Sequence, residues 1–193
     1  MKTILRAAML GGLLLVQALS YAESKHSITP KFGEYNLEST TQTIAGSTST
    51  FEKSSSSVGV EYKYKITDNM TIGGSGDYFK HNYNRATIDG TMGTTLVMFN
   101  LKYKIPVADW FNPYIGASAG IAAVNMSGSI IGTAIDAATG ISIGMAFPIN
   151  DTFAIGVEYR KINSEITGEL TNGNTAVIDA SGDVLTANLT ITF

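Results

Sequence analysis

The sequence predicts an all-β protein, a transmembrane antiparallel up-and-down β-barrel of about eight strands with short periplasmic turns and longer external loops. Three observations predict it. The N-terminus has the pattern of an export signal, the rest of the chain alternates apolar and polar residues in segment after segment, and short turns alternate with long polar connections.

The first 22 residues predict a cleaved signal peptide. Lys2 and Arg6 supply its positive charge, an apolar run follows over residues 7–19, and Ser20-Tyr21-Ala22 has small residues where an A-x-A-like cleavage site needs them. The alternative, an uncleaved anchor, is disfavoured because the apolar run is shorter than the roughly 18 to 20 residues that cross a bilayer as a helix.

Cleavage would leave one outer-membrane β-barrel domain, residues 23–193, after the signal peptide of residues 1–22. Losing Lys2 and Arg6 leaves eleven of the thirteen basic residues against sixteen acidic ones, a net charge of −5. An acidic chain is not expected to bind nucleic acid. The chain has no cysteine, so neither a disulfide nor a lipid-modified N-terminus is expected.

Two-residue alternation marks the strands. In one segment Val58, Val60 and Tyr62 share a face, whereas Glu61 and Lys63 lie on the other. Eight such segments are expected, roughly residues 27–40, 55–66, 70–87, 92–105, 113–126, 132–147, 153–168 and 176–193.

The connections alternate in length. Residues 67–69, 106–112 and 148–152 are expected to form tight or proline-marked turns, and the remaining connections are longer and rich in Ser, Thr, Asn and Gly. Within these long connections, Asp89-Gly90 and Asn172-Gly173 are two-residue hairpin signals, so the flanking strands are expected to project beyond the membrane as ribbons.

The apolar faces are expected to point outward to lipid rather than inward as in a soluble barrel. They carry almost no charge, and charge on a lipid face is costly. Aromatic residues gather near the predicted turns and strand ends, as in an interfacial girdle: Tyr64, Tyr103, Trp110, Phe111, Phe147, Phe153 and Phe193. Spanning strands must also close on themselves, because unpaired backbone groups in lipid are expensive.

With these features the chain resembles the opacity-type and OmpX/OmpA-type family of small eight-stranded outer-membrane proteins. The exported N-terminus, the strand entry Asn112-Pro113-Tyr114-Ile115-Gly116-Ala117 and the C-terminal alternation ending on Phe193 carry the resemblance. It implies a place in the bacterial outer membrane, contact with outer-membrane lipid, and Phe193 as part of the signal read by the outer-membrane assembly machinery. It does not select among the family's roles.

The opposite faces are expected to line a filled lumen, since about eight strands leave an interior just wide enough for side chains. Opposite charges confined there must pair. We therefore expect a lumen charge network of Glu61, Lys63, Asp77, Lys102, Glu158 and Arg160. Small residues on strands five and six would give the long side chains room. The alternative is that these small residues leave a narrow wet path.

No catalytic, cofactor or metal site is predicted. His26 follows the cleavage site and His81 lies near the outer end of a strand, so the two are expected at opposite ends of the barrel. The leading hypothesis is a structural and interaction protein that acts through its external loops on a host or envelope protein, as an adhesin or envelope-integrity protein. The alternatives are a narrow channel for small solutes and, less favoured, a lipid-modifying enzyme in which His81 is the general base.

Overall fold

The computed structural model describes residues 25–44, 47–85, 88–127, 133–169 and 175–193. The expected signal peptide and the Asn172-Gly173 turn lie outside these residues. The described part of the chain contains no helix long and apolar enough to cross a membrane.

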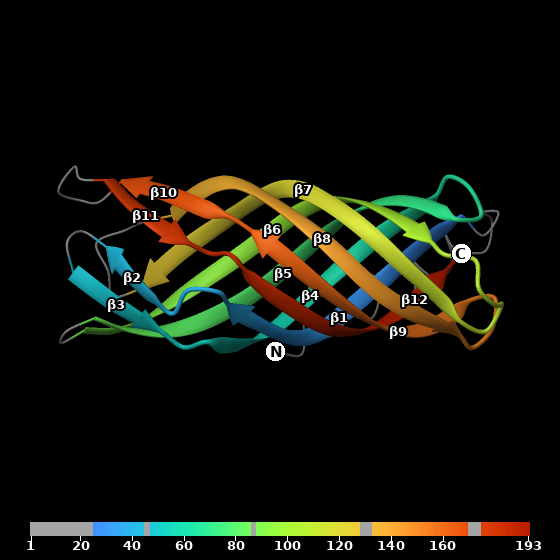
Figure 1. The fold of residues 1–193 in the computed structure, drawn as a ribbon, viewed down its shortest axis with the longest axis horizontal. Helices are drawn as coiled ribbons and strands as arrows, with labels where there is room; N and C mark the ends of the chain where they lie inside the picture. The colour runs from blue at the N-terminus through green and yellow to red at the C-terminus, as the bar shows by residue number, and fades with distance from the viewer. Residues whose placement is uncertain (1–24, 45–46, 86–87, 128–132, 170–174) are drawn as a thin grey trace, which may run out of the picture.

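Eight long antiparallel strands form a closed barrel (Figure 1). Each pairs with its sequence neighbour, and the first strand pairs with the last from Ser27 opposite Thr192 to Leu37 opposite Gly182. The barrel strands are β1 (His26–Leu37), β4 (Ser54–Lys65), β5 (Met70–Arg85), β6 (Ile88–Lys104), β7 (Asn112–Ser127), β8 (Thr133–Pro148), β9 (Phe153–Asn163) and β12 (Gly182–Thr192). The predicted fold class is confirmed.

The seam between β1 and β12 is held at its end by the backbone of the terminal residue. The His26 N–H donates to the Phe193 carbonyl at 3.1 Å, and the Phe193 N–H donates to the His26 carbonyl at 2.8 Å. The two rings also stack, with centroids 6.0 Å apart. Pro30 has no N–H, and the ladder to β12 is interrupted beside it, yet the register is the same on both sides of the gap.

At one end of the barrel, three short turns join neighbouring strands (right in Figure 1). We call it the periplasmic end, in line with the expected topology. At one of these turns the Asn150 side-chain oxygen accepts hydrogen bonds from the backbone N–H groups of Thr152 and Phe153, at 2.9 and 2.8 Å. The side chain thus substitutes for backbone pairing where the chain reverses, as Asn commonly does in turns.

At the other, external end two additional hairpins extend the barrel. The first, β2 (Thr41–Ile44) and β3 (Ser47–Phe51), lies where only a Ser/Thr-rich loop was expected. The second, β10 (Glu165–Glu169) and β11 (Thr175–Asp179), forms a separate two-stranded sheet. The predicted strands 153–168 and 176–193 are therefore each broken, at Ser164 and at residues 180–181. There the Ala180 N–H donates to the Ser164 carbonyl at 2.9 Å, and beyond this point β10 and β11 pair with each other in their own sheet.

The prediction of a two-residue turn at Asp89-Gly90 was wrong. The β5–β6 ladder pairs Asn84 with Asp89 and Tyr83 with Gly90, so both residues lie within β6. The same ladder runs without a bulge from Met70 opposite Tyr103 to Arg85 opposite Ile88. Its register, fixed by many cross-strand pairs, places the reversal between residues 85 and 88 and overrides the local turn preference.

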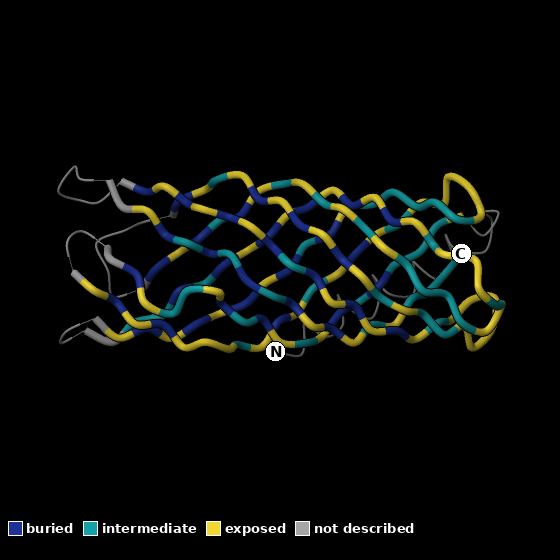
Figure 2. Tube along the Cα trace, in the orientation of Figure 1, coloured by how far each residue is buried: buried dark blue, intermediate teal, exposed yellow. Residues whose placement is uncertain are grey.

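Exposed and buried residues alternate along the barrel strands (Figure 2). Many of the exposed positions carry large apolar side chains, which form a band around the barrel. On β5 the outward positions change from Tyr78 to the exposed polar residues Lys80 and Asn82, which sets the external limit of the band there. Exposed apolar residues in every barrel strand indicate a surface for lipid rather than water. The predicted outward orientation of the apolar faces is confirmed.

The external half of the lumen is also apolar, which the alternation pattern did not predict. Its fully buried side chains include Tyr35, Phe79, Met92, Leu96 and Ile162. Two residues of the second hairpin, Ile166 and Ile178, are buried as well and extend this core beyond the barrel wall. Inward positions thus change character along the axis, from apolar at the external end to charged near the middle.

Candidate functional site in the barrel lumen

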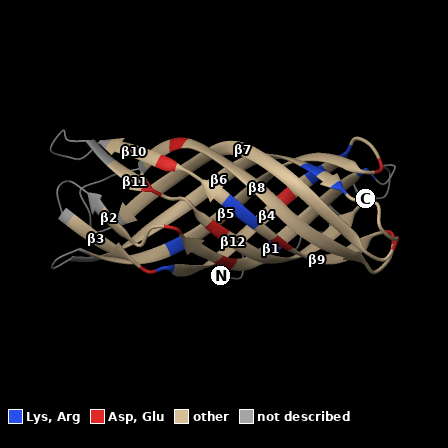
Figure 3. Ribbon diagram, viewed as in Figure 1, with Lys and Arg blue, Asp and Glu red and all other residues tan. Residues whose placement is uncertain are grey.

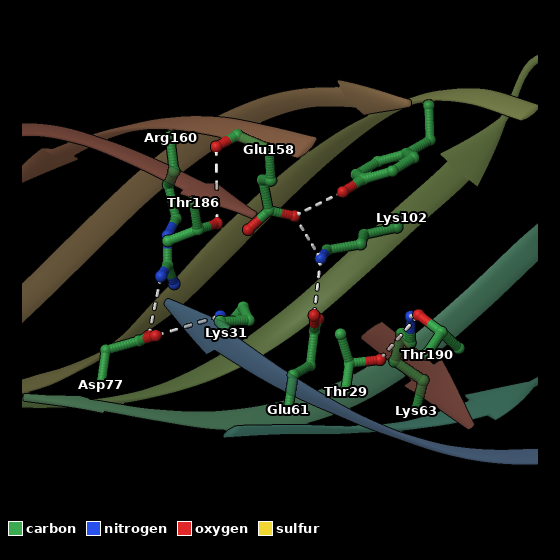
Figure 4. Close-up of polar contacts among 11 residues, drawn as sticks. Thr29, Lys31, Glu61, Lys63, Asp77, Lys102, Glu158, Arg160, Thr186 and Thr190 are labelled. Atoms are coloured by element: carbon green, nitrogen blue, oxygen red, sulfur yellow. Dashed lines mark hydrogen bonds and ion pairs between the residues drawn. The ribbon is translucent and has the colours of Figure 1, made fainter. Parts of the chain in front are cut away.

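A bridge of three charged side chains crosses the middle of the lumen (Figure 4). The Lys102 ammonium on β6 donates to Glu61 on β4 at 2.8 Å and to Glu158 on β9 at 2.5 Å. The Tyr114 hydroxyl on β7 donates to the same Glu158 carboxylate at 3.0 Å. One lysine therefore connects carboxylates from opposite walls of the barrel.

A second cluster lies beside the first, toward the external end. Arg160 on β9 donates to Asp77 on β5 at 2.7 Å, and Lys31 on β1 lies 3.1 Å from the other oxygen of the same carboxylate. All three side chains are almost completely buried. Because such charges are costly to bury singly, each is held by an opposite charge within hydrogen-bonding distance.

Five of the six residues expected in the lumen charge network thus form ion pairs, in two clusters. The sixth, Lys63, contacts a neutral group instead. No ion pair among the described residues involves Lys63. Its ammonium donates to the Thr190 hydroxyl at 3.2 Å, and that hydroxyl in turn lies 3.0 Å from Thr29 (Figure 4).

Sequence reasoning missed Lys31, which joins the second cluster. The expected strand 27–40 was hard to assign to faces, because Pro30 interrupts it and Phe32 shares its parity with Glu34 and Asn36. In the structure Phe32 points outward, 62% exposed, whereas Lys31 points inward. The sequence did hold a signal for this. Lys31 shares its parity with Thr29, Gly33 and Tyr35, so these four residues lie on one face of the strand, opposite Phe32.

The small residues on β7 and β8 make room for the long side chains. A Cβ added to Gly116 would lie 2.6 Å from the Ser142 Oγ and 3.0 Å from the Lys102 Cγ. A Cβ added to Gly144 would lie 2.4 Å from the Tyr114 ring. All three distances are shorter than van der Waals contact. Neighbouring side chains therefore already occupy the space beside these two glycines, which leaves no open path there.

An aromatic layer lies on the external side of the charges. The rings of Tyr35 and Phe79 stack with centroids 3.7 Å apart, and the Tyr35 hydroxyl donates to the Ala180 carbonyl. Lumen side chains of β6 and β9, including Leu96 and Ile162, are buried next to this layer. Charges at the middle and apolar packing above them therefore fill the lumen over its external half.

His81 is buried at the external end, beyond the apolar band. One ring nitrogen lies 3.0 Å from the Glu52 carbonyl and the other lies 3.3 Å from the Ser55 hydroxyl. The carbonyl can only accept, so the neutral ring donates to Glu52 and accepts from Ser55. Burial lowers the pKa of His81 below its ordinary value. Sequence reasoning missed the Ser55 contact, which arises from cross-strand proximity. Since His81 is fully buried, the pair has no solvent access through the imidazole.

A vestibule opens on the periplasmic side of the charge network, with a volume of about 510 Å³. Four lysines line it, Lys63, Lys65, Lys102 and Lys104. Several Lys and Arg positions, blue in Figure 3, lie toward this end of the barrel. Lys65 forms a 2.7 Å ion pair with Asp68 at the rim, and this hydrogen-bonded ammonium lowers the pKa of the Asp68 carboxyl. Within the described residues, no group of three His, Cys, Asp or Glu side chains is arranged to hold a metal ion.

A closed barrel with an apolar outer band, a buried charge network in its lumen and short turns at one end defines a small transmembrane β-barrel protein. Residues 7–193 match the family described as the outer membrane protein beta-barrel domain, and the chain belongs to that family. It is accordingly a protein of the bacterial outer membrane. Comparison with curated proteins finds no match.

Solved structures with the same fold include three outer-membrane proteins. OprG of Pseudomonas aeruginosa is 12% identical, with a TM-score of 0.66 over 89% of this chain and 97% of OprG. Neisserial surface protein A is 15% identical, with a TM-score of 0.55 over 89% and 98%. Ail, the attachment invasion locus protein of Yersinia pestis, in complex with the heparin analogue sucrose octasulfate, is 16% identical, with a TM-score of 0.52 over 89% and 100%. At these identities the likeness concerns the fold.

Proposed function

We propose that this protein is a closed outer-membrane barrel that binds a partner polypeptide through its external hairpins, after export and removal of residues 1–22. The filled external half of the lumen carries this proposal. The charges of Lys102 and Arg160 are paired, and the aromatic layer of Tyr35 and Phe79 lies above them, so these described side chains fill the lumen where a polar path would run. The external strands are the parts left to carry an activity.

Open strand edges at the external end support binding of an extended segment. Among the described residues, β2 pairs with β3 alone and β11 pairs with β10 alone. Between β2 and β11 the Gln42 amide bridges the backbone of Asp179: it donates to the carbonyl at 2.7 Å and accepts from the N–H at 3.1 Å. One side chain thus satisfies two backbone groups with which a further strand could otherwise pair. Within the described parts of β2 and β11, the outer edge of each strand has no ladder partner.

The charge at this end favours a cationic partner. Among the residues whose side chains are described, acidic ones outnumber basic ones there: Glu34, Glu38, Glu52, Asp136, Glu165, Asp179 and Asp183 against Lys53, Lys80 and Lys161. The Ail structure contains a sulfated heparin analogue. An excess of carboxylates would repel such a polyanion, so we infer a basic polypeptide segment rather than a sulfated glycan for this chain.

The test measures how much of a labelled peptide binds to cells that display the protein. We expect deletion of residues 41–50, or the charge reversal Glu165→Lys, to reduce binding of a labelled extended peptide of alternating Lys and Val. The matched control is Asp151→Lys, which makes the same charge reversal at a periplasmic turn. Heat-modifiable migration checks that each barrel is folded. Binding by both external variants at the wild-type level would remove the proposal.

The two alternatives receive less support. A narrow channel needs a continuous wet path, whereas Asp77 and Arg160 are paired and buried where the path would run. A lipid-modifying enzyme based on His81 needs access to the imidazole, which is fully buried. To test the enzyme hypothesis, lipid A masses are compared among cells carrying the wild type, the His81→Ala variant and an inactive vector. Equal masses in all three would exclude it.

A further inference from the structure

Beyond partner binding at the external end, the lumen carries a charge imbalance at the periplasmic end. The described lumen and vestibule walls contain six cations and five carboxylates: Lys31, Lys63, Lys65, Lys102, Lys104 and Arg160 against Glu61, Asp68, Asp77, Asp151 and Glu158. Lys65 and Asp68 pair at the exposed rim, whereas the charges deeper in the lumen need compensation, because an unpaired charge in a low-dielectric lumen is costly. One cation is therefore uncompensated.

The Asp77 cluster has one cation more than it has carboxylates and the Lys102 bridge has one fewer, so the two clusters balance each other and the excess falls among the remaining groups of the vestibule wall. Lys31 and Arg160 share Asp77, Lys102 is held between Glu61 and Glu158, and Lys65 is paired with Asp68 at the rim. These pairs leave two lysines of the vestibule wall, Lys63 and Lys104.

Lys63 and Lys104 both line the vestibule, and neither takes part in an ion pair among the described residues. The one remaining carboxylate in the wall is Asp151, at the rim. Lys63 lies deeper, against the charge network, where its ammonium donates only to the neutral Thr190 hydroxyl at 3.2 Å. An ammonium has three donors, so Lys63 keeps capacity for an anion.

The rest of the wall suits an oxyanion. Hydroxyl and amide groups surround the lysines, among them those of Ser27, Thr71, Asn112 and Thr192. Such donors can bind several oxygens of one group, and charge-assisted hydrogen bonds from lysine are the stronger ones. A volume of about 510 Å³ lies in the range of small-molecule pockets.

We propose that this vestibule is a binding site for a small phosphate-bearing solute of the periplasm, with Lys63 as its main charged contact and Lys104 as a second. The cavity lies inside the barrel mouth, behind the strands, so a free solute reaches it more directly than a lipid headgroup does. Because the charge network closes the lumen above it, the site is a dead end that captures its ligand from the periplasmic side. It shares no residue with the external hairpins.

The experiment titrates inorganic phosphate into the refolded protein by calorimetry, in a maltoside detergent that contains no phosphate. Sodium chloride at matched ionic strength is the blank. We expect saturable one-to-one binding with a dissociation constant on the order of 1 mM, weakened on the order of tenfold by Lys63→Gln. Lys104→Gln should weaken it less. The matched control Lys161→Gln removes a lysine at the external end and should bind as wild type.

The outcomes separate cleanly. Phosphate heats equal to those of chloride, or equal affinity in Lys63→Gln and wild type, would overturn the site. Glutamine retains a donor toward Thr190, and heat-modifiable migration reports folding of each variant, so lost binding in a folded Lys63→Gln protein supports it. A parallel arm adds short-chain phosphatidylglycerol to the micelles. Saturation by that lipid, with none by free phosphate, would overturn the assignment to a soluble ligand.

Discussion

Replacing Lys102 with methionine would remove the cation between Glu61 and Glu158 while keeping a side chain of similar length. The lysine Nζ lies 2.8 and 2.5 Å from the two carboxylates, and the three side chains are at most 10% exposed. Breaking a buried pair by removing one partner costs about 3–5 kcal/mol, because the other charge stays buried without compensation. Here two carboxylates would lose their shared partner, so we expect a loss in that range.

Urea unfolding of the refolded protein in lipid vesicles measures this loss. With a slope of about 1–3 kcal/mol per molar urea, a loss of about 3 kcal/mol lowers the midpoint by at least about 1 M. The matched control is Lys161→Met, which removes an exposed ion pair with Glu38 at 3.5 Å and should cost at most about 1 kcal/mol. A Lys102→Met midpoint within the error of the control would refute the view that the lumen charges form a closed, desolvated network.

Three further predictions concern the lumen, the wall and the seam. In planar bilayers the wild type should be silent, whereas Arg160→Ala, which leaves Asp77 without its guanidinium, should leak; steady discrete wild-type openings would promote the channel hypothesis. Gly120→Ala should prevent or severely destabilise folding, because its Cβ would lie 2.0 Å from the Val97 carbonyl oxygen. A Cβ at Gly76 meets nothing within 4 Å, so the control Gly76→Ala should migrate as a folded barrel when electrophoresis is run without heating the sample. Replacing Phe193 with alanine should reduce the amount of barrel in the outer-membrane fraction, and equal assembly with wild type would contradict its expected place in the assembly signal.

The alternation of residue types was sufficient to predict the barrel strands and their outward faces. A strand's period is fixed at two, so a run such as Val58, Val60 and Tyr62 commits every neighbour to one side. The same rule placed Glu61, Lys102 and Glu158 inside, and the need to pair confined charges gave the expectation of a network. Where Pro30 and Phe32 confused the parity, the inward position of Lys31 was missed.

Parity says which way a side chain points, but not how far along the axis its partner lies. That depends on the register between distant strands, which brings Lys102 to Glu61 and Glu158 and leaves Lys63 with Thr190. Register also overrode the turn preference of Asp89-Gly90.

The sequence by itself therefore determined the fold class, the sidedness of most strands and the charged residues that face the lumen apart from Lys31, because these follow from local periodicity and from the cost of charge in lipid. Only the tertiary structure decided which charges pair, that the external half of the lumen is packed with apolar side chains, and that Lys63 faces the vestibule with the Thr190 hydroxyl rather than a carboxylate as its partner. These depend on closure of β1 against β12, which fixes the relative heights of strands far apart in the chain.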